Sequence, residues 1–279
     1  MSARRTERPS AQGRQARFDR HALYAQPRLY DLAFGFRDIS AECDGILALA
    51  GRYGVKNPRS VAEMGCGPAH HLRELSRRGL RAYGIDVNPA MLRYARRLCE
   101  RAAVRVSLQR ADMRDFTLAK PVDLMTCLFD SFSHCTTDAD GVAALQCAAR
   151  GLKQDGLLVI ELSHPADFFR GNSKRTSNRW TQRYGHAVLR TRFTTTCLDA
   201  IRETYVASMR VDASFGNGYK ARRIVDRQLH RIWLRSSIAH VAAANREFDV
   251  VGWHGDLRPQ APLDMSSDAW RMVAVLRRR

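Results

Sequence analysis

The chain has 279 residues, of which 45% are hydrophobic and 27% are charged. This composition is typical of a soluble globular protein with an apolar core, and the length fits one elaborated domain. Its 46 basic and 28 acidic residues give a formal net charge of +18, which would favour a nucleic acid or an anionic membrane as partner. Only five of the basic residues are lysines, so an arginine-rich compositional background explains the charge as well. Nucleic acid is therefore an alternative partner that the composition does not favour.

The cysteines and the N-terminus bear on the cellular compartment. The seven cysteines form no C-x-x-C pair, so the sequence predicts neither a metal site of the zinc type nor a disulfide framework. Nowhere do 18 consecutive apolar residues occur, and the N-terminus has charges without an apolar signal-peptide core. We therefore expect no membrane span and no secretion. Residues 1–20 are predicted to be a disordered basic tail, and the protein is expected to be cytoplasmic.

After this tail the hydrophobic period changes along the chain. Residues 29–54 have the apolar spacing of one or two helices. Short apolar runs of strand length then alternate with segments of helix length. The predicted strands span 60–64, 82–86, 104–108, 122–129 and 157–162, and the predicted helices span 70–78, 89–100 and 139–152. Strands that alternate with helices indicate βαβ units and hence a mainly parallel α/β sheet.

Residues 166–235 break this rhythm. Segments 188–197 and 201–211 alternate by two, which places Ile201, Tyr205, Met209 and Val211 on one face. Together with 224–234 they predict an inserted antiparallel β meander. A helix at 236–247 and strands at 248–253 and 270–276 follow. We therefore expect one domain built from 21–165 and 236–279, and an inserted segment at 166–235 that serves as a lid or for dimerisation.

The turn after the first strand is the feature that suggests chemistry. Gly65 and Gly67 lie between the strand at 60–64 and the helix at 70–78, where glycines let the backbone turn sharply and lie against a ligand. Asp86 ends the next strand, placed to accept both hydroxyls of a ribose. Asp112 follows the third strand, placed to accept the amino group of an adenine while Met113 packs on the ring. Three strand ends in this order predict a site for a nucleoside.

The turn also fits two other interpretations. A lone Gly-x-Gly also occurs in any tight connection between a strand and a helix. A dinucleotide site is disfavoured because the turn lacks the third glycine of Gly-x-Gly-x-x-Gly, with Ala69 in place of a glycine at the wrong offset, and because Glu63 precedes the loop. The Glu63 carboxylate would repel a pyrophosphate and suits a ligand with a positively charged amino acid moiety.

At these residues the sequence resembles the class I S-adenosylmethionine-dependent methyltransferases, over about 24–165 and again from 236 to the C-terminus. Motifs at 29–38, 67–72, 111–116 and 128–132 resemble those of small-molecule N-methyltransferases that act on glycine-like amines and amino sugars. The resemblance implies a Rossmann-like seven-stranded, mainly parallel sheet with helices on both faces, and S-adenosyl-L-methionine as the cofactor. It implies cofactor-binding roles for Tyr30, Arg37, Gly65, Gly67, Asp86, Asp112, Met113 and Leu128. The sequence departs from the family at Pro68 and Ala69, where a third glycine is usual.

The acceptor side is predicted from the later strand ends. Methyl transfer from a sulfonium is a direct displacement, so the enzyme mainly positions the reacting atoms. An amine acceptor must lose a proton, and His134 and His164, which follow the fourth and fifth strands, are the candidate catalytic bases. Each of them also fits a hydrogen-bonded residue at the rim of a site.

The expected function is methyl transfer to a small molecule, at nitrogen. RNA methylation is the alternative, but the fourth strand runs into Asp130-Ser131-Phe132 rather than the Asn/Asp-Pro-Pro-aromatic tetrapeptide of enzymes that methylate exocyclic base nitrogens. Related enzymes that use the cofactor without transferring methyl, and a silent binding protein on the same fold, are further alternatives. The sequence leaves a homodimer open.

Overall fold

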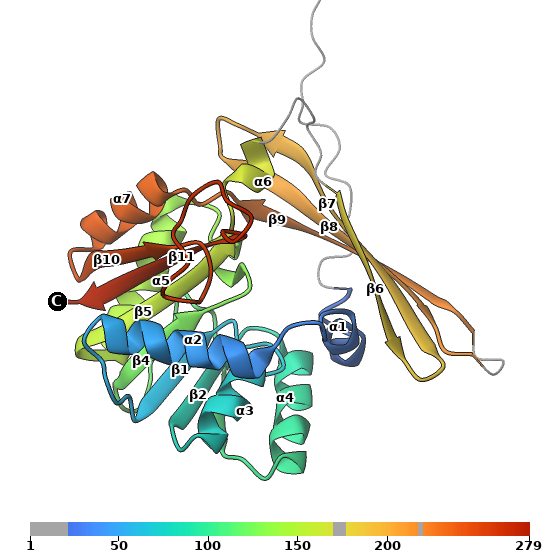
Figure 1. Cartoon of the computed structure of the whole chain (residues 1–279), viewed down its shortest axis with the longest axis horizontal. Helices are drawn as coiled ribbons and strands as arrows, with labels where there is room; N and C mark the ends of the chain where they lie inside the picture. The colour runs from blue at the N-terminus through green and yellow to red at the C-terminus, as the bar shows by residue number, and fades with distance from the viewer. Residues whose placement is uncertain (1–21, 170–176, 217–219) are drawn as a thin grey trace, which may run out of the picture.

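The computed structural model describes residues 22–169, 177–216 and 220–279, so the basic tail predicted at 1–20 lies outside the described residues. These residues form two separate sheets (Figure 1). One has seven strands in the order β10-β11-β5-β4-β1-β2-β3, and the other has four strands in the order β6-β7-β8-β9. The predicted fold class, a mainly parallel α/β sheet with an added antiparallel meander, is confirmed.

The seven-stranded sheet is parallel except at one edge. Its strands are β1 Ser60–Met64, β2 Arg81–Asp86, β3 Val106–Arg110, β4 Val122–Cys127, β5 Leu152–Ser163, β10 Phe248–His254 and β11 Arg271–Arg278. β1 pairs in parallel with β2 on one side and β4 on the other, whereas β11 runs antiparallel to β5 and β10. The strand order reverses between β1 and β4. Ligands bind outside the carboxyl ends of parallel strands at such a reversal.

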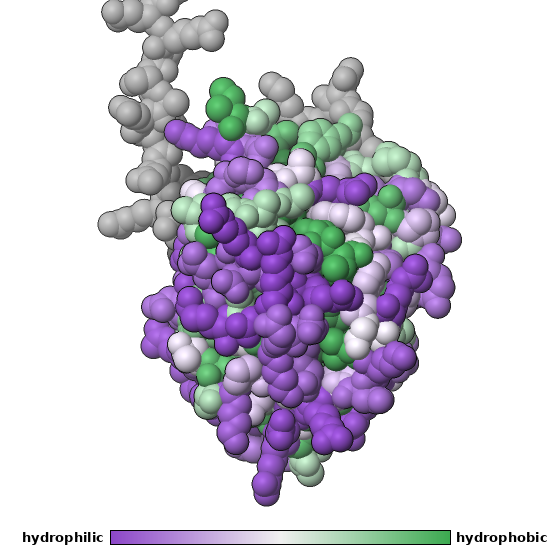
Figure 2. Space-filling model, turned by 90° about the vertical axis from the view of Figure 1, so that its left-hand side faces the viewer, coloured by the Kyte–Doolittle hydropathy of each residue, from purple (hydrophilic) through white to green (hydrophobic). Residues whose placement is uncertain are grey.

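Helices cover both faces of this sheet (Figure 1). The helices are α2 Ile39–Arg52, α3 His70–Arg77, α4 Pro89–Arg101, α5 Asp138–Gly151 and α7 Arg235–Asn245. Apolar residues of α5 and α7 pack in one core cluster with one face of the sheet, and those of α2, α3 and α4 pack in a second cluster on the other. The outer faces of such amphipathic helices are polar, and the side of the molecule in Figure 2 is largely hydrophilic with scattered apolar side chains. No helix among the described residues has the length and apolar character needed to cross a bilayer.

The antiparallel sheet and the first helix form a layer of their own. The strands are β6 Ser177–Tyr184, β7 Ala187–Asp199, β8 Thr204–Ser214 and β9 Arg222–Arg231. Helix α1, Pro27–Ala33, packs its buried Leu29 and Ala33 against Leu189 and Val211 of this sheet. The short helices η1 (Ser131–His134) and α6 (Ala166–Phe169) follow β4 and β5. Helix α1 therefore lies between the two sheets, which places its remaining side chains near the carboxyl edge of the main sheet.

Two details of the meander differ from the sequence-based expectation. β6 was not predicted, because its residues are nearly all exposed or half-exposed and give no apolar alternation. Ile201 was expected on the buried face of a strand, but it is 96% exposed. Its segment is a turn in which the amides of Ile201 and Arg202 donate to Asp199 Oδ1, and β8 begins only at Thr204. The other members of the predicted face, Tyr205, Met209 and Val211, are buried or pack against buried clusters.

Candidate active site

The glycine turn follows β1 at the carboxyl edge of the main sheet. Gly65 and Gly67 have φ angles of +70° and +49°, in the left-handed region that favours glycine. The amides of Gly65 and Cys66 donate to the carbonyl of Ile85 on β2, at 2.8 and 3.0 Å. A Cβ on Gly65 would lie 2.9 Å from the side chain of Ser131, whereas a Cβ on Gly67 would meet nothing within 4 Å. The turn is therefore tight at Gly65 and open at Gly67.

Ala69 stands where the resemblance leads us to expect glycine. It is fully buried and, as the residue that precedes helix α3, has a φ of 58°. A left-handed conformation destabilises an L-residue by roughly 1–2 kcal/mol. Ala69 thus adopts the left-handed backbone conformation that a glycine would adopt more easily, and the backbone is strained at this residue.

Asp86 is held in a fixed orientation at the end of β2. Its Oδ2 accepts a hydrogen bond from the amide of Gly67 at 2.8 Å, and its Oδ1 accepts one from the amide of Asn88 at 2.7 Å. Burial raises the pKa of the Asp86 carboxyl, although these two backbone bonds favour its charged form. A carboxylate positioned in this way keeps lone pairs that can accept hydrogen bonds from a ligand.

Asp112 and Met113 follow β3. Arg114 donates to both carboxylate oxygens of Asp112, at 2.9 and 2.7 Å, and these bonds lower the pKa of Asp112. The Met113 sulfur lies 3.7 Å from the sulfur of Cys135, and its methyl carbon would be 3.7 Å from a Cβ on Gly65. Met113 therefore reaches from the third strand end to the glycine turn.

A cavity of about 600 Å³ lies over these strand ends. We call it the glycine-loop cavity. Seven of the residues predicted from the sequence line it: Tyr30, Gly65, Gly67, Asp86, Asp112, Met113 and His134. They come from α1, from the ends of three strands and from η1, and the tertiary structure brings them together as predicted.

Three other predicted residues do not line this cavity. Leu128 is 2% exposed and packs in the apolar core. His164 is also buried, and its Nδ1 accepts a hydrogen bond from the amide of Ala166 at the start of α6. Arg37 is ion-paired with two acidic residues: its Nε donates to Glu42 at 2.6 Å and its Nη2 donates to Glu161 at 3.0 Å. For Leu128 and His164 the reason is that a position just after a strand does not determine whether the side chain faces a cavity or the protein interior. The predicted roles of all three residues stay predictions.

Glu161 is a residue whose role the sequence did not indicate. It is 1% exposed and ion-paired with Arg37 and Arg271. Burial opposes its ionisation, but Arg37 and Arg271 lower the pKa of Glu161 to about 2. Its Oε2 also accepts the amide of Phe129 at 2.9 Å. Phe129 and Asp130 both have positive φ, 54° and 63°, so Glu161 holds a strained turn that follows β4.

A second cavity of about 420 Å³ lies beside the first. We call it the aromatic cavity, because Phe34, Phe36, Phe129, Phe168, Phe193, Trp180, Trp270, Tyr24, Tyr30 and Tyr205 line it. Strands β6 to β9 supply one wall, including Trp180, Phe193 and Tyr205. Five residues line both cavities, namely Tyr24, Tyr30, Phe129, Asp130 and His230. The strained turn at Phe129–Asp130 is therefore part of the boundary between the two cavities.

A hydrogen-bonded chain reaches this boundary from the antiparallel sheet. The Tyr205 hydroxyl on β8 donates to Asp130 Oδ2 at 3.2 Å and lies 3.3 Å from Nδ1 of His230 on β9. Since the hydroxyl has one proton, which it gives to Asp130, it accepts from His230 Nδ1–H. This fixes the tautomer and leaves the lone pair on Nε2. Nε2 is buried with no hydrogen-bond partner among the described residues.

The surroundings of His230 keep it neutral. Burial lowers the pKa of His230 to about 4. The ring of His134 packs against it with the centroids 4.4 Å apart, and Tyr205 lies on another side. No sequence signal pointed to His230, because a single histidine on a strand far from the glycine turn is indistinguishable from a core residue.

Carboxylates dominate the charge of the aromatic cavity. Asp130, Asp167 and Asp226 line it, with Arg271 as the one cation among its described lining residues. Arg271 is already paired with Glu161. Burial raises the pKa of Asp130, which also accepts hydrogen bonds from Ser163 and Ser133. An aromatic wall combined with carboxylates is an environment that favours a ligand with a positively charged group.

Comparison with known proteins supports the resemblance. Residues 61–156, which include β1 to β4 and the glycine turn, match the family described as a methyltransferase domain. This confirms the resemblance deduced from Gly65, Asp86 and Asp112.

The relatives of this domain include enzymes of sugar metabolism. The chain is 33% identical over 135 residues to a dTDP-3-amino-3,6-dideoxy-alpha-D-glucopyranose N,N-dimethyltransferase from Streptomyces fradiae, a match that covers 48% of this chain and 51% of that protein. A dTDP-4-amino-2,3,4,6-tetradeoxy-D-glucose N,N-dimethyltransferase from Saccharopolyspora spinosa is 28% identical, over 55% of this chain and 61% of that protein. The chain thus spans between half and two thirds of the length of these curated relatives.

Solved structures share the fold over most of the chain. DesVI from Streptomyces venezuelae has a TM-score of 0.74 at 18% identity, over 89% of this chain and 97% of that chain. CalS10, an amino pentose methyltransferase from Micromonospora echinaspora whose structure was solved with S-adenosylmethionine bound, has a TM-score of 0.70 at 20% identity, over 90% and 97% of the two chains.

Proposed function

We propose that this protein binds S-adenosylmethionine in the glycine-loop cavity and transfers its methyl group to the nitrogen of a small amine in the aromatic cavity. The observation that carries the proposal is the shared boundary of the two cavities, because a direct displacement requires donor and acceptor to meet at one place.

The residues present fit this cofactor. The backbone at Gly67 leaves open space that a side chain would fill, and Asp86 offers a fixed, desolvated carboxylate for the two ribose hydroxyls. Asp112 would accept the amino group of the adenine, and Met113 would pack on its ring. Tyr30 would lie at the methionine end, next to the aromatic cavity. Arg37 and Leu128 would act indirectly, by holding Glu161 and by filling the core beneath the loop.

The chain's residues would supply positioning and one proton transfer. When bound, the cofactor supplies an electrophilic methyl group on a positively charged sulfur. An amine that accepts this methyl group through its nitrogen lone pair would also have to give up one proton. We assign His230 as the acceptor of that proton, because its ring lines both cavities and its unprotonated Nε2 has no partner among the described residues. Nε2 is itself shielded from solvent, so neighbouring side chains would have to shift for it to meet the amine. His134 packs against it and would orient the ring.

The acceptor would be an amino sugar or a similar amine. Three carboxylates and an aromatic wall suit a cationic amine with an apolar body. The curated relatives named above act on dTDP-linked amino sugars, which is the same chemistry. Residues 166–235 would cover the acceptor and exclude water from it, because their strands provide one wall of the aromatic cavity. This observation favours a role as a lid over a role in dimerisation. RNA methylation is the weaker alternative, because Arg271, the one cation among the described lining residues, is already paired with Glu161.

Cofactor binding can be tested by calorimetry. Asp86→Ala should weaken the binding of S-adenosylmethionine by about 1.5–3 kcal/mol, the typical value for hydrogen bonds to a charged group. Asp249→Ala is the matched control, because Asp249 pairs with Arg279 at the far edge of the main sheet. Equal affinities of the two variants would refute the placement of the cofactor.

The acceptor can be tested with methyl-labelled cofactor. We expect label in a pool of small amines that includes nucleotide-linked amino sugars, and none in total RNA at physiological salt. Label in RNA alone would overturn the proposal, and consumption of the cofactor without label in either pool would point to chemistry other than methyl transfer.

A further inference from the structure

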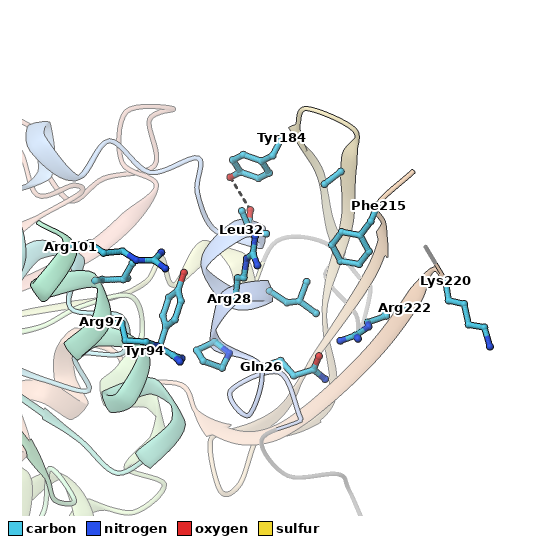
Figure 3. A pocket seen from close by; sticks show the side chains of 14 residues that line it. Gln26, Arg28, Leu32, Tyr94, Arg97, Arg101, Tyr184, Phe215, Lys220 and Arg222 are labelled. Atoms are coloured by element: carbon cyan, nitrogen blue, oxygen red, sulfur yellow. Dashed lines mark hydrogen bonds between the residues drawn. The ribbon is translucent and has the colours of Figure 1, made fainter. Parts of the chain in front are cut away.

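A third hollow lies on the opposite side of helix α1 from the two cavities. It has a volume of about 940 Å³ and shares no lining residue with either of them. Helix α4, helix α1 and the β7–β9 side of the antiparallel sheet supply its walls, as Figure 3 shows. We call it the basic groove.

The charges of this groove are all of one sign. Arg28, Arg97, Arg101, Lys220 and Arg222 line it, and its described lining residues include no aspartate or glutamate. All five side chains are exposed. Within the described part of the chain, none of the five has a salt bridge or a side-chain hydrogen bond. Five unpaired cations around one concavity produce a positive potential that attracts an anion.

The cations come from separate elements that the fold brings together. Arg97 and Arg101 are four residues apart on α4 and therefore lie side by side on one helix face. Like charges at this spacing destabilise a helix, and neither arginine has a salt bridge among the described residues, although the C-terminal end of α4 partly compensates Arg101. Arg28 comes from α1 and Arg222 from β9, across the groove (Figure 3). Two adjacent guanidinium groups suit two neighbouring phosphates, because guanidinium binds phosphate oxygens in a bidentate manner.

The remaining lining of the groove is apolar and aromatic. Leu29, Leu32, Tyr94, Tyr184 and Phe215 line it between the cations. The hydroxyls of the two tyrosines are already used, since Tyr94 donates to Asp31 Oδ2 and Tyr184 donates to the carbonyl of Leu32. Their rings are therefore fixed as surfaces against which a flat group can pack. A ligand that matches the whole groove joins phosphate groups to an aromatic ring.

We propose that the basic groove is a binding site for a nucleoside diphosphate, separate from the site of methyl transfer. A polynucleotide shares this chemistry but fits less well. Helix α1, one of the walls of the groove, has seven residues and is only about 10 Å long. This wall spans one nucleotide rather than a tracked strand. The site lies back to back with the glycine-loop cavity, because Leu29 and Leu32 of α1 line the groove while Tyr30 lines the cavity.

The test is a titration with uridine diphosphate in the presence and absence of excess S-adenosylmethionine. We expect binding in both cases, weakened by at least about tenfold in Arg97→Gln/Arg101→Gln, the loss expected when charge-assisted hydrogen bonds are removed. The matched control is Arg93→Gln/Arg96→Gln, which removes two exposed arginines of the same helix that do not line the groove and should leave the affinity unchanged. Binding should also weaken with salt.

Several outcomes would overturn the proposal. The proposal fails if uridine diphosphate does not bind, or if the groove variant and the control variant bind it equally well. It also fails if inorganic pyrophosphate binds as tightly as the nucleotide, or if only a single-stranded uridine oligonucleotide binds. The Asp86→Ala variant separates this inference from the proposed function, because it should lose cofactor affinity while the basic groove still binds the nucleotide.

Discussion

The main sheet lines the glycine-loop cavity with the ends of three successive parallel strands, at Gly65, Asp86 and Asp112. The antiparallel sheet instead lines the aromatic cavity with side chains from all four of its strands, including Trp180, Phe193, Tyr205 and His230. The first arrangement depends on a turn that few sequences can adopt. The second depends on which face of a meander is buried. We therefore expect substitutions in the first region to change cofactor affinity and those in the second to change turnover.

The largest expected effect is at the residue that links the two regions. Glu161→Gln removes the charge between Arg37 and Arg271, and breaking a buried ion pair from one side costs about 3–5 kcal/mol. Because Glu161 also holds the Phe129–Asp130 turn, both cofactor affinity and turnover should fall. Chemical denaturation measures the stability. Glu203→Gln removes an exposed carboxylate whose partner Arg231 keeps a second acid, Asp138, and should lose less than about 1 kcal/mol. Equal losses in the two variants would contradict the expected cost of breaking the buried Glu161 ion pairs.

The second effect tests the proton acceptor. His230→Ala should lower kcat by about 100-fold or more at neutral pH, a typical contribution of general base catalysis, with the Kd of the cofactor unchanged. Activity should recover at higher pH, where the amine loses its proton to solvent. His134→Ala should show a smaller loss without this recovery. A loss in His230→Ala that is the same at every pH would indicate a structural role only.

The same histidine makes a prediction about stability. Its pKa is lowered to about 4 in the folded protein from an ordinary value near 6.5, so its neutral form stabilises the fold above pH 6.5. That contribution is lost as the pH falls from about 6.5 to 4. His230→Ala should accordingly unfold with a smaller pH dependence in this range than the natural sequence, as thermal melts can measure.

A third effect concerns the glycine turn. Gly65→Ala should weaken cofactor binding by about 2 kcal/mol, because the new Cβ would lie 2.9 Å from Ser131 and a left-handed alanine is itself strained by roughly 1–2 kcal/mol. Gly79→Ala introduces the same strain at a φ of +91° with nothing within 4 Å. Its cofactor affinity should stay that of the natural sequence. Calorimetry on both variants separates steric contact in the turn from general strain.

The smallest effect concerns the orientation of His230. Tyr205→Phe removes the hydroxyl between Asp130 and Nδ1 of His230, which should lower kcat by about tenfold, the equivalent of one hydrogen bond. Nitrogen NMR of the imidazole should then report a mixture of tautomers instead of one. Tyr184→Phe, which alters a hydroxyl outside both cavities, should change neither quantity. An unchanged imidazole spectrum in Tyr205→Phe would contradict the hydrogen-bonded chain.

The sequence alone determined the order of the βαβ elements and which strand ends meet at the glycine-loop cavity. β1 begins and ends where the apolar run predicted, and seven of ten proposed site residues line one cavity. This was predictable because parallel strands bring their ends to one edge, so that residues just after successive strands must meet. The sheet order, with β11 inserted antiparallel between β5 and β10, was not expressed in any local pattern.

Only the tertiary structure decided the acceptor half. Leu128 and His164 follow strands as Asp86 does, yet they face the interior, because orientation after a strand is set by packing and not by position. His230 and Tyr205 come to the boundary of the two cavities only when β8 and β9 pair and pack against η1. Period-two alternation predicted the buried face of β8, but which face of the meander meets the main sheet depends on contacts between segments far apart in the chain.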